Sequence, residues 1–104
     1  MKEIENTKLN IDGDSLHLWI GGRLDTFRAM SVDEMLEDIP ETVKNIFFDF
    51  EKLEYISSAG LRVLYWAQDY TRKRGGKALV KNVSSSLMEI LVTTGFKKLI
   101  SIEE

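Results

Sequence analysis

The middle of the chain alternates between two hydrophobic patterns, and this alternation restricts the possible folds most strongly. Residues 45–50 (NIFFDF) form a short apolar and aromatic run that is typical of a buried strand. Apolar side chains then recur at helical spacing from about residue 57 to residue 74, where Gly75 and Gly76 follow. Residues 77–81 (KALVK) indicate another short strand. A strand, a helix and a strand in this order predict parallel pairing with a right-handed crossover.

The N-terminal part indicates a hairpin. Residues 3–10 alternate loosely between apolar and polar side chains, and residues 12–14 (DGD) are a turn signal. Residues 15–20 (SLHLWI) alternate cleanly, which predicts a second strand with one buried face. We expect His17 and Trp19 on the opposite, open face.

Two further helices complete the pattern. Ser31 and Glu34 have the spacing of a capping box, so we expect a helix that begins there and ends at Pro40. A third helix is expected to start at residues 84–86 (SSS) and to end at Gly95 in the left-handed conformation.

Residues 99–102 are expected to form a last short strand. The predicted order is β-β-α-β-α-β-α-β within a single domain, residues 1–104. The predicted fold class is α/β, with a mixed, mostly parallel β-sheet and helices packed against it.

Composition narrows the function classes. Fourteen Lys and Arg against seventeen Asp and Glu give a net charge of −3, and the one basic run, residues 72–74, falls where a helix dipole favours cations. We therefore expect no nucleic-acid partner.

There is no cysteine, no apolar stretch long enough to span a membrane and no signal-peptide core at the start. These features favour a cytoplasmic protein with no membrane partner.

Catalysis is not expected, although two serines precede a helix. The nucleophile-elbow pattern requires glycine two residues before the serine, and Ile56 stands there for Ser58. His17, the single histidine, lies far away in sequence and offers neither a base nor a metal site. We expect no enzyme activity, no metal and no cofactor.

Ser57 and Ser58 are open to two interpretations. Either serine can cap the following helix, which stabilises it by about 1 kcal/mol. Alternatively, a phosphate on one of them would be held by the helix N-terminus, with Arg62 one turn further along. Physical reasoning on these residues alone favours the cap.

The order of several motifs resembles the STAS family, the sulfate-transporter and anti-sigma factor antagonist domains. The resemblance extends over nearly the whole chain. The matching pieces are Gly22-Arg23-Leu24-Asp25, Ile46 to Phe50 with Leu53, Tyr55-Ile56-Ser57-Ser58-Ala59-Gly60-Leu61-Arg62-Val63-Leu64, Asn82-Val83-Ser84, Thr94-Gly95-Phe96 and Leu99-Ile100.

This resemblance implies an anti-sigma factor antagonist. In that mechanism the unmodified chain binds an anti-sigma factor, a serine kinase of the histidine-kinase-like ATPase fold, and so frees the sigma factor. Phosphorylation at Ser58, with Ser57 as the alternative acceptor, releases the partner, and a serine phosphatase reverses the modification. The resemblance implies a partner-binding surface made of Asp25, Thr26, Arg28, Ser57, Ser58, Ala59, Gly60, Leu61 and Arg62.

Some residues differ from the family pattern, and a second function is compatible with the sequence. Ser57 and Ala59 stand where sporulation-type members carry Asp and Ser, and Arg28 stands where relatives often carry Asn. The alternative function is a STAS subunit that stabilises the ATPase of a lipid-transport ABC complex. We expect a monomer, although the sheet or the face of Trp19 could support a dimer.

Overall fold

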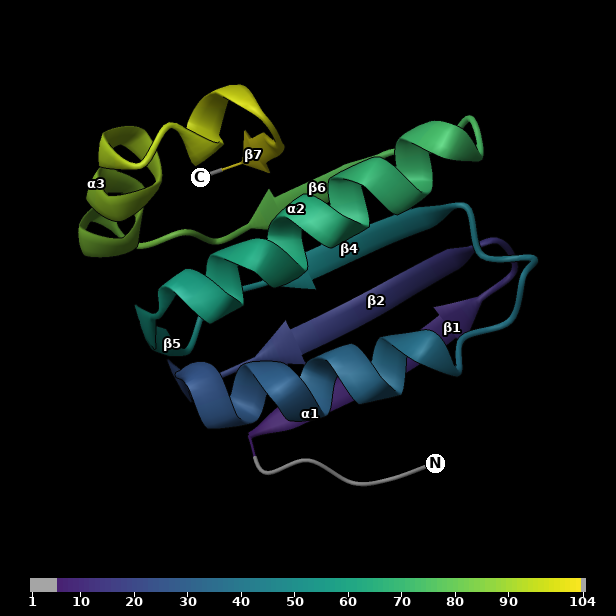
Figure 1. The fold of residues 1–104 in the computed structure, drawn as a ribbon, viewed down its shortest axis with the longest axis horizontal. Coiled ribbons are helices and arrows are strands. Elements are labelled where there is room, and N and C mark those ends of the chain that lie inside the picture. The colour runs from purple at the N-terminus through teal and green to yellow at the C-terminus, as the bar shows by residue number, and fades with distance from the viewer. Residues whose placement is uncertain (1–5, 104) are drawn as a thin grey trace.

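A five-stranded sheet forms the base of the computed structural model, which describes residues 6–103. The strands follow the spatial order β1-β2-β4-β6-β7; β1 runs antiparallel to β2, and every other pair is parallel (Figure 1). The predicted mixed, mostly parallel sheet is confirmed. The bounds are β1 (Thr7–Asp12), β2 (Ser15–Ile20), β4 (Asn45–Asp49), β6 (Ala78–Lys81) and β7 (Ser101–Glu103).

The N-terminal hairpin is confirmed with a shifted first strand. The prediction began at residue 3, and residues 3–5 lie outside the described part of the chain. β1 continues through Asp12, and Gly13 turns the chain with a φ of +61°. Leu9 lies opposite Leu18 in the hairpin register, so both strands direct apolar side chains to the same face.

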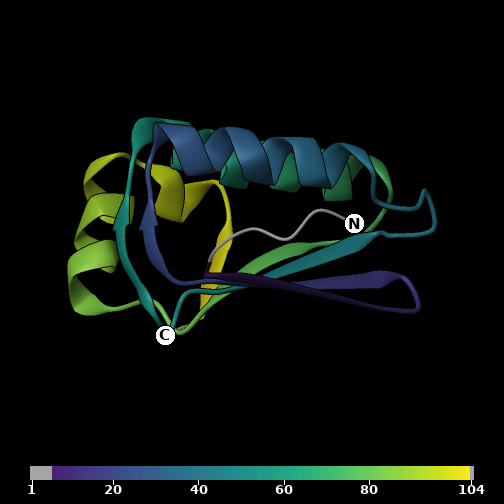
Figure 2. The same cartoon turned by 90° about the horizontal axis from the view of Figure 1, so that it is seen from below.

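Two helices cover one face of this sheet. α1 (Thr26–Glu37) and α2 (Ser58–Lys73) lie side by side above it, as Figure 2 shows. α3 (Ser85–Thr93) and the short 3₁₀ helix η1 (Phe96–Lys98) lie at one end of the molecule. Among the described elements, none crosses the opposite face of the sheet.

The predicted start of α1 was wrong. The helix begins at Thr26, five residues before the expected capping box, and Ser31 lies inside it. Asp25 is the N-cap, and its Oδ1 accepts a hydrogen bond of 2.9 Å from the backbone N–H of Arg28. Because Asp25 already caps the helix, Ser31 and Glu34 lie within it and do not form a capping box at its start.

Two strands were missing from the predicted order. β3 (Gly22–Leu24) and β5 (Leu53–Ile56) pair in parallel as a separate two-stranded sheet. They rise from one end of the main sheet, where β2 and β4 finish, to the level of the helices (Figure 2). Their ends lead directly into α1 and α2, so this small sheet determines where both helices begin.

The core lies between the main sheet and the two helices. It combines the inward side chains of the central strands with the apolar stripes of α1 and α2. The fully buried members include Leu16, Leu18, Ile20, Ile46, Phe48, Val80, Val32, Val63 and Leu64. His17 and Trp19 lie on the uncovered face, as predicted from their alternation.

The glycines at the helix ends act as expected. α2 ends before Gly75, which has a φ of +73°, and a Cβ at Gly76 would overlap the carbonyl of Lys44. Gly95 follows α3 with a φ of +83°. Ser84 caps α3 by accepting a hydrogen bond from the backbone N–H of Leu87.

Candidate phosphorylation and partner-binding site

The starts of α1 and α2 lie next to each other. Leu24 and Ile56 pair across the β3–β5 sheet, and the N-cap of a helix follows each of them. The backbone N–H of Ser57 donates a hydrogen bond of 2.9 Å to the carbonyl of Leu24. Because both helices leave the same edge of a parallel pair, both positive dipole ends face the same end of the molecule (Figure 1).

Ser57 is the cap of α2. Its Oγ accepts a hydrogen bond of 3.2 Å from the backbone N–H of Gly60, and the residue is only 9% exposed. The hydroxyl oxygen therefore has a structural partner inside the protein.

Ser58 is the first residue of α2, and it is exposed. The first turn of α2 contains no acidic residue, so a negative group there meets the helix dipole without a competing carboxylate from that turn. Arg62 is also exposed and lies one turn further along the helix.

Three expected contact residues lie inside the protein. Ala59 and Leu61 are 8% and 6% exposed, and Gly60 is buried. A Cβ at Gly60 would lie 2.7 Å from Cγ1 of Ile56 and 3.0 Å from the carbonyl oxygen of Leu24. These residues contribute to the packing under the start of α2 and expose little side-chain surface.

Arg62 also interacts with α1. Burial raises the pKa of Asp33 in α1, the negative charge of Glu37 raises it further, and the positive charge of Arg62 lowers it. Asp33 and Arg62 thus attract one another across the two helices.

The three expected residues on α1 have different environments. Thr26 is exposed and Asp25 is half-buried at the start of the helix. Arg28 is directed inward: its Nη1 donates hydrogen bonds of 2.6 Å to the carbonyls of Gly21 and Arg23. Arg28 therefore fixes the chain between β2 and α1.

Two exposed apolar residues on α1 were missed by the sequence reasoning. Phe27 is 77% exposed and Met30 is 59% exposed. Phe27 comes two residues after the cap Asp25, on the same end of the molecule as Ser58. A helix placed from residue 26 would have shown both side chains off the core stripe formed by Ala29, Val32 and Leu36.

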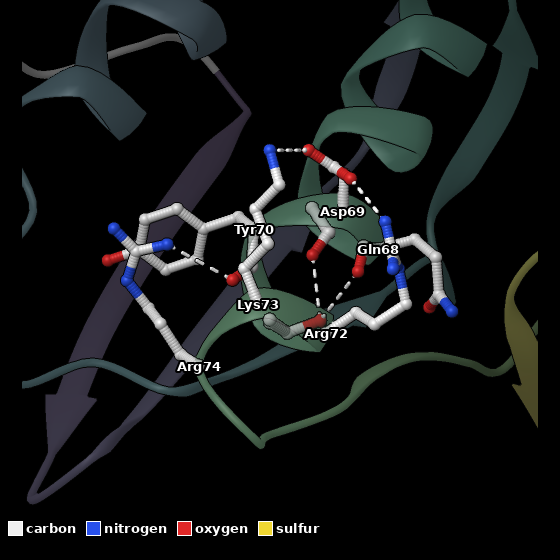
Figure 3. Close-up of polar contacts among 8 residues, drawn as sticks. Gln68, Asp69, Tyr70, Arg72, Lys73 and Arg74 are labelled. Atoms are coloured by element: carbon white, nitrogen blue, oxygen red, sulfur yellow. Dashed lines mark hydrogen bonds and ion pairs between the residues drawn. The ribbon is translucent and has the colours of Figure 1, made fainter.

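The C-terminal half of α2 is held by its own polar side chains, as Figure 3 shows. Asp69 pairs with Arg72 at 2.7 Å and with Lys73 at 2.9 Å. The Arg74 guanidinium lies 3.5 Å from the ring centroid of Tyr70 and donates a hydrogen bond to the Tyr70 carbonyl. The basic run thus interacts with its own helix.

Three further features of the described residues concern metal binding, membrane crossing and cavities. Between residues 6 and 103, no cluster of three or more His, Asp or Glu side chains could hold a metal ion. No helix in that range has the length and apolar character to cross a membrane. One open cavity of about 790 Å³ lies at the ends of β2 and β4, between residues such as Lys8, Trp19, Asp49 and Lys52, and Ser58 is not among the residues that line it.

The sequence matches the STAS domain model over residues 6–104. The chain belongs to the STAS family. No curated protein sequence matches this STAS domain.

Solved structures share its fold. A putative anti-sigma factor antagonist from Thermotoga maritima is 17% identical, with a TM-score of 0.84 over 96% of this chain and 87% of the other. The anti-sigma factor antagonist SpoIIAA in its unphosphorylated form is 15% identical, with a TM-score of 0.79 over 92% and 86%. A sulfate transporter family protein from Wolinella succinogenes is 24% identical, with a TM-score of 0.74 over 86% and 76%.

Proposed function

We propose that this STAS domain is an anti-sigma factor antagonist whose partner binding is controlled by phosphorylation of Ser58. The observation that carries the proposal is that the two serines differ in burial and in hydrogen bonding. Ser57 is buried and its oxygen caps α2, whereas Ser58 is exposed at the first position of the same helix. A kinase can reach Ser58 without breaking the cap.

The site suits a phosphate electrostatically. A phosphoserine carries a charge of about −1.5 to −2 at neutral pH. The N-terminus of α2 and the Arg62 guanidinium would stabilise that charge, so the domain can stay folded when it is modified. Bacillus SpoIIAA, which has a similar fold at 15% identity and a TM-score of 0.74, has been solved in a phosphorylated form.

Release of the partner follows from the same charge. The partner, a serine kinase that acts as an anti-sigma factor, would bind across the starts of α1 and α2. A dianion placed in that interface loses its hydration and repels acidic groups opposite it. A serine phosphatase then restores the binding form.

A capture experiment tests this function. Wild-type, Ser58→Asp and Ser58→Ala proteins serve as baits in lysate of the source organism, and captured proteins are quantified by mass spectrometry. We expect a kinase-fold protein on the wild-type and Ser58→Ala baits and its loss on Ser58→Asp. Equal capture of a transporter ATPase by all three baits would instead support a constitutive subunit of a lipid-transport complex.

A further inference from the structure

The uncovered face of the five-stranded sheet carries an apolar centre. His17, Phe47 and Leu79 lie side by side on β2, β4 and β6. The His17 ring packs against Phe47 at 5.1 Å and against Trp19 at 6.1 Å between ring centroids. Trp19 is still 38% exposed. An apolar centre of this kind within a polar rim is typical of a protein interface.

A row of charges crosses the same face beside this centre. The strand registers align Lys8 with Trp19, Trp19 with Asp49, Asp49 with Lys81 and Lys81 with Glu103. The row therefore begins with a cation on edge strand β1 and ends with an anion on edge strand β7. The Lys8 ammonium lies 5.9 Å from the centroid of the Trp19 ring.

We propose that this face binds a second copy of the chain. The twofold axis of this dimer runs between the two sheets, parallel to the central strand β4. Rotation about that axis lays β1 of one copy over β7 of the other and keeps the strands nearly parallel, as in aligned sheet packing. Lys8 then faces Glu103 of the second copy, and Trp19 faces Lys81 of the second copy. The pair of opposite charges, Lys8 and Glu103, therefore occurs at both edges of the interface.

The centre of the proposed interface is consistent with the same axis. Phe47 lies on β4 and meets Phe47 of the second copy, which suits aromatic packing. Asp49 also lies on β4, so its carboxylate faces the like-charged Asp49 carboxylate of the second copy. Its oxygens already accept hydrogen bonds from the Asn82 amide at 3.1 Å and from the backbone N–H of Glu51 at 3.0 Å.

The size of the face predicts a reversible dimer. The five strands have three to six residues each, and at about 3.3 Å per residue and about 4.8 Å between strands they cover about 400 Å² per copy. Two copies would bury about 800 Å², which is the size of a weak, transient interface. The dimer should therefore dissociate on dilution. It uses a different surface from Ser58 and does not depend on the proposed function.

Charge reversal tests the pairing directly. Sedimentation equilibrium is measured from micromolar to millimolar concentration for wild type, Lys8→Glu, Glu103→Lys and the double variant. The wild-type mass should rise from 11.9 kDa toward twice that value. Each single variant should weaken the dimer about tenfold, because each reversal acts twice in a symmetric dimer. The double variant should restore it.

The control is Lys98→Glu, an exposed change on η1, which should leave the dimer unchanged. A wild-type mass that stays monomeric at every concentration overturns the proposal and leaves the face to another protein. A dimer that tolerates both single reversals also overturns it, because the chain then associates through another surface.

Fluorescence gives a second readout. In a Trp66→Phe background, Trp19 is the single tryptophan, and its emission should shift to shorter wavelength as the dimer forms. A doubled mass with unchanged Trp19 emission would show that this face stays exposed. Ser58→Asp should dimerise like wild type.

Discussion

The backbone N–H of Ser57 donates a 2.9 Å hydrogen bond to the carbonyl of Leu24. This bond joins the last residue of β3 to the cap of α2 and aligns the starts of the two helices. The exposed hydroxyl of Ser58 is thereby placed beside the start of α1. A partner that binds Ser58 would meet both helices at once.

Replacement of Ser57 and of Ser58 by alanine should have different effects on the free energy of unfolding. Ser57→Ala removes the hydrogen-bond acceptor for Gly60 and should lower the free energy of unfolding by about 1 kcal/mol. Ser58→Ala changes an exposed side chain and should stay within about 0.5 kcal/mol of wild type. Urea unfolding measures both. Equal losses in the two variants would contradict the assignment of Ser57 as the cap.

Gly60 allows the close approach of α2 to β3. In Gly60→Ala, the new Cβ would meet Ile56 at 2.7 Å and Leu24 at 3.0 Å, so one side chain and the backbone of the site must move. We expect a loss of about 1–3 kcal/mol in unfolding free energy, as for other overpacked positions. Ser58→Ala in the same turn is the control. A Gly60→Ala variant as stable as wild type would show that α2 has room to shift.

Arg28 should act mainly as a structural residue. Arg28→Met removes hydrogen bonds to the carbonyls of Gly21 and Arg23 and to Oγ1 of Thr7. We expect a loss of about 2 kcal/mol in the free energy of unfolding, because each carbonyl loses a charged donor. Arg28→Lys should recover part of it, since a single ammonium cannot bridge all three acceptors.

The control for Arg28 is Arg23→Met. The Arg23 side chain is exposed, and its guanidinium lies 4.1 Å from the centroid of the Tyr55 ring. Its loss should cost less than about 1 kcal/mol. A larger effect at Arg23 than at Arg28 would argue against the anchoring role.

Asp69 gives a prediction for pH and salt. The hydrogen bond from Lys73, with help from Arg72, holds the pKa of Asp69 below its usual range. A lowered pKa in the folded state means that the stabilisation is present above the ordinary pKa of Asp and is lost as the pH falls through the lowered value. Asp69→Asn should therefore have a lower Tm than wild type at neutral pH.

That difference should shrink in high salt and disappear in acid, because the pairs are exposed and screened. Glu41→Gln, at an exposed turn position, is the matched control. A Tm difference for Asp69→Asn that is independent of salt and pH would mean that the carboxylate acts by another route.

The sequence was sufficient to predict the mixed, mostly parallel sheet and α2, although the last strand lies at residues 101–103 rather than 99–102 because η1 takes up residues 96–98. The run over residues 45–81 contains the clear patterns of β4, α2 and β6, with Gly75 and Gly76 as a stop signal for the helix. Strands β3 and β5 were missed because they are short, with 3 and 4 residues, and because, unlike β6, neither alternates regularly between more buried and less buried residues. The register of β3 also shifts between Gly22 and Arg23.

The candidate site could be predicted only in outline. The resemblance to the family indicated Ser58, but the division between a buried Ser57 and an exposed Ser58 depends on the tertiary bond from Ser57 to Leu24. The start of α1 was misplaced because the Ser31–Glu34 spacing is a local signal, whereas Arg28 anchors the preceding turn through distant carbonyls. Phe27 was missed for the same reason.

The most direct test adds Mg-ATP to the purified complex of wild-type chain and captured kinase, and follows phosphate incorporation and dissociation together. We predict one phosphate on Ser58 and a fall in affinity of about 100-fold or more, with no release of Ser58→Ala. A complex that stays intact after Ser58 is fully phosphorylated, or a phosphate found on another residue, would contradict the proposed switch.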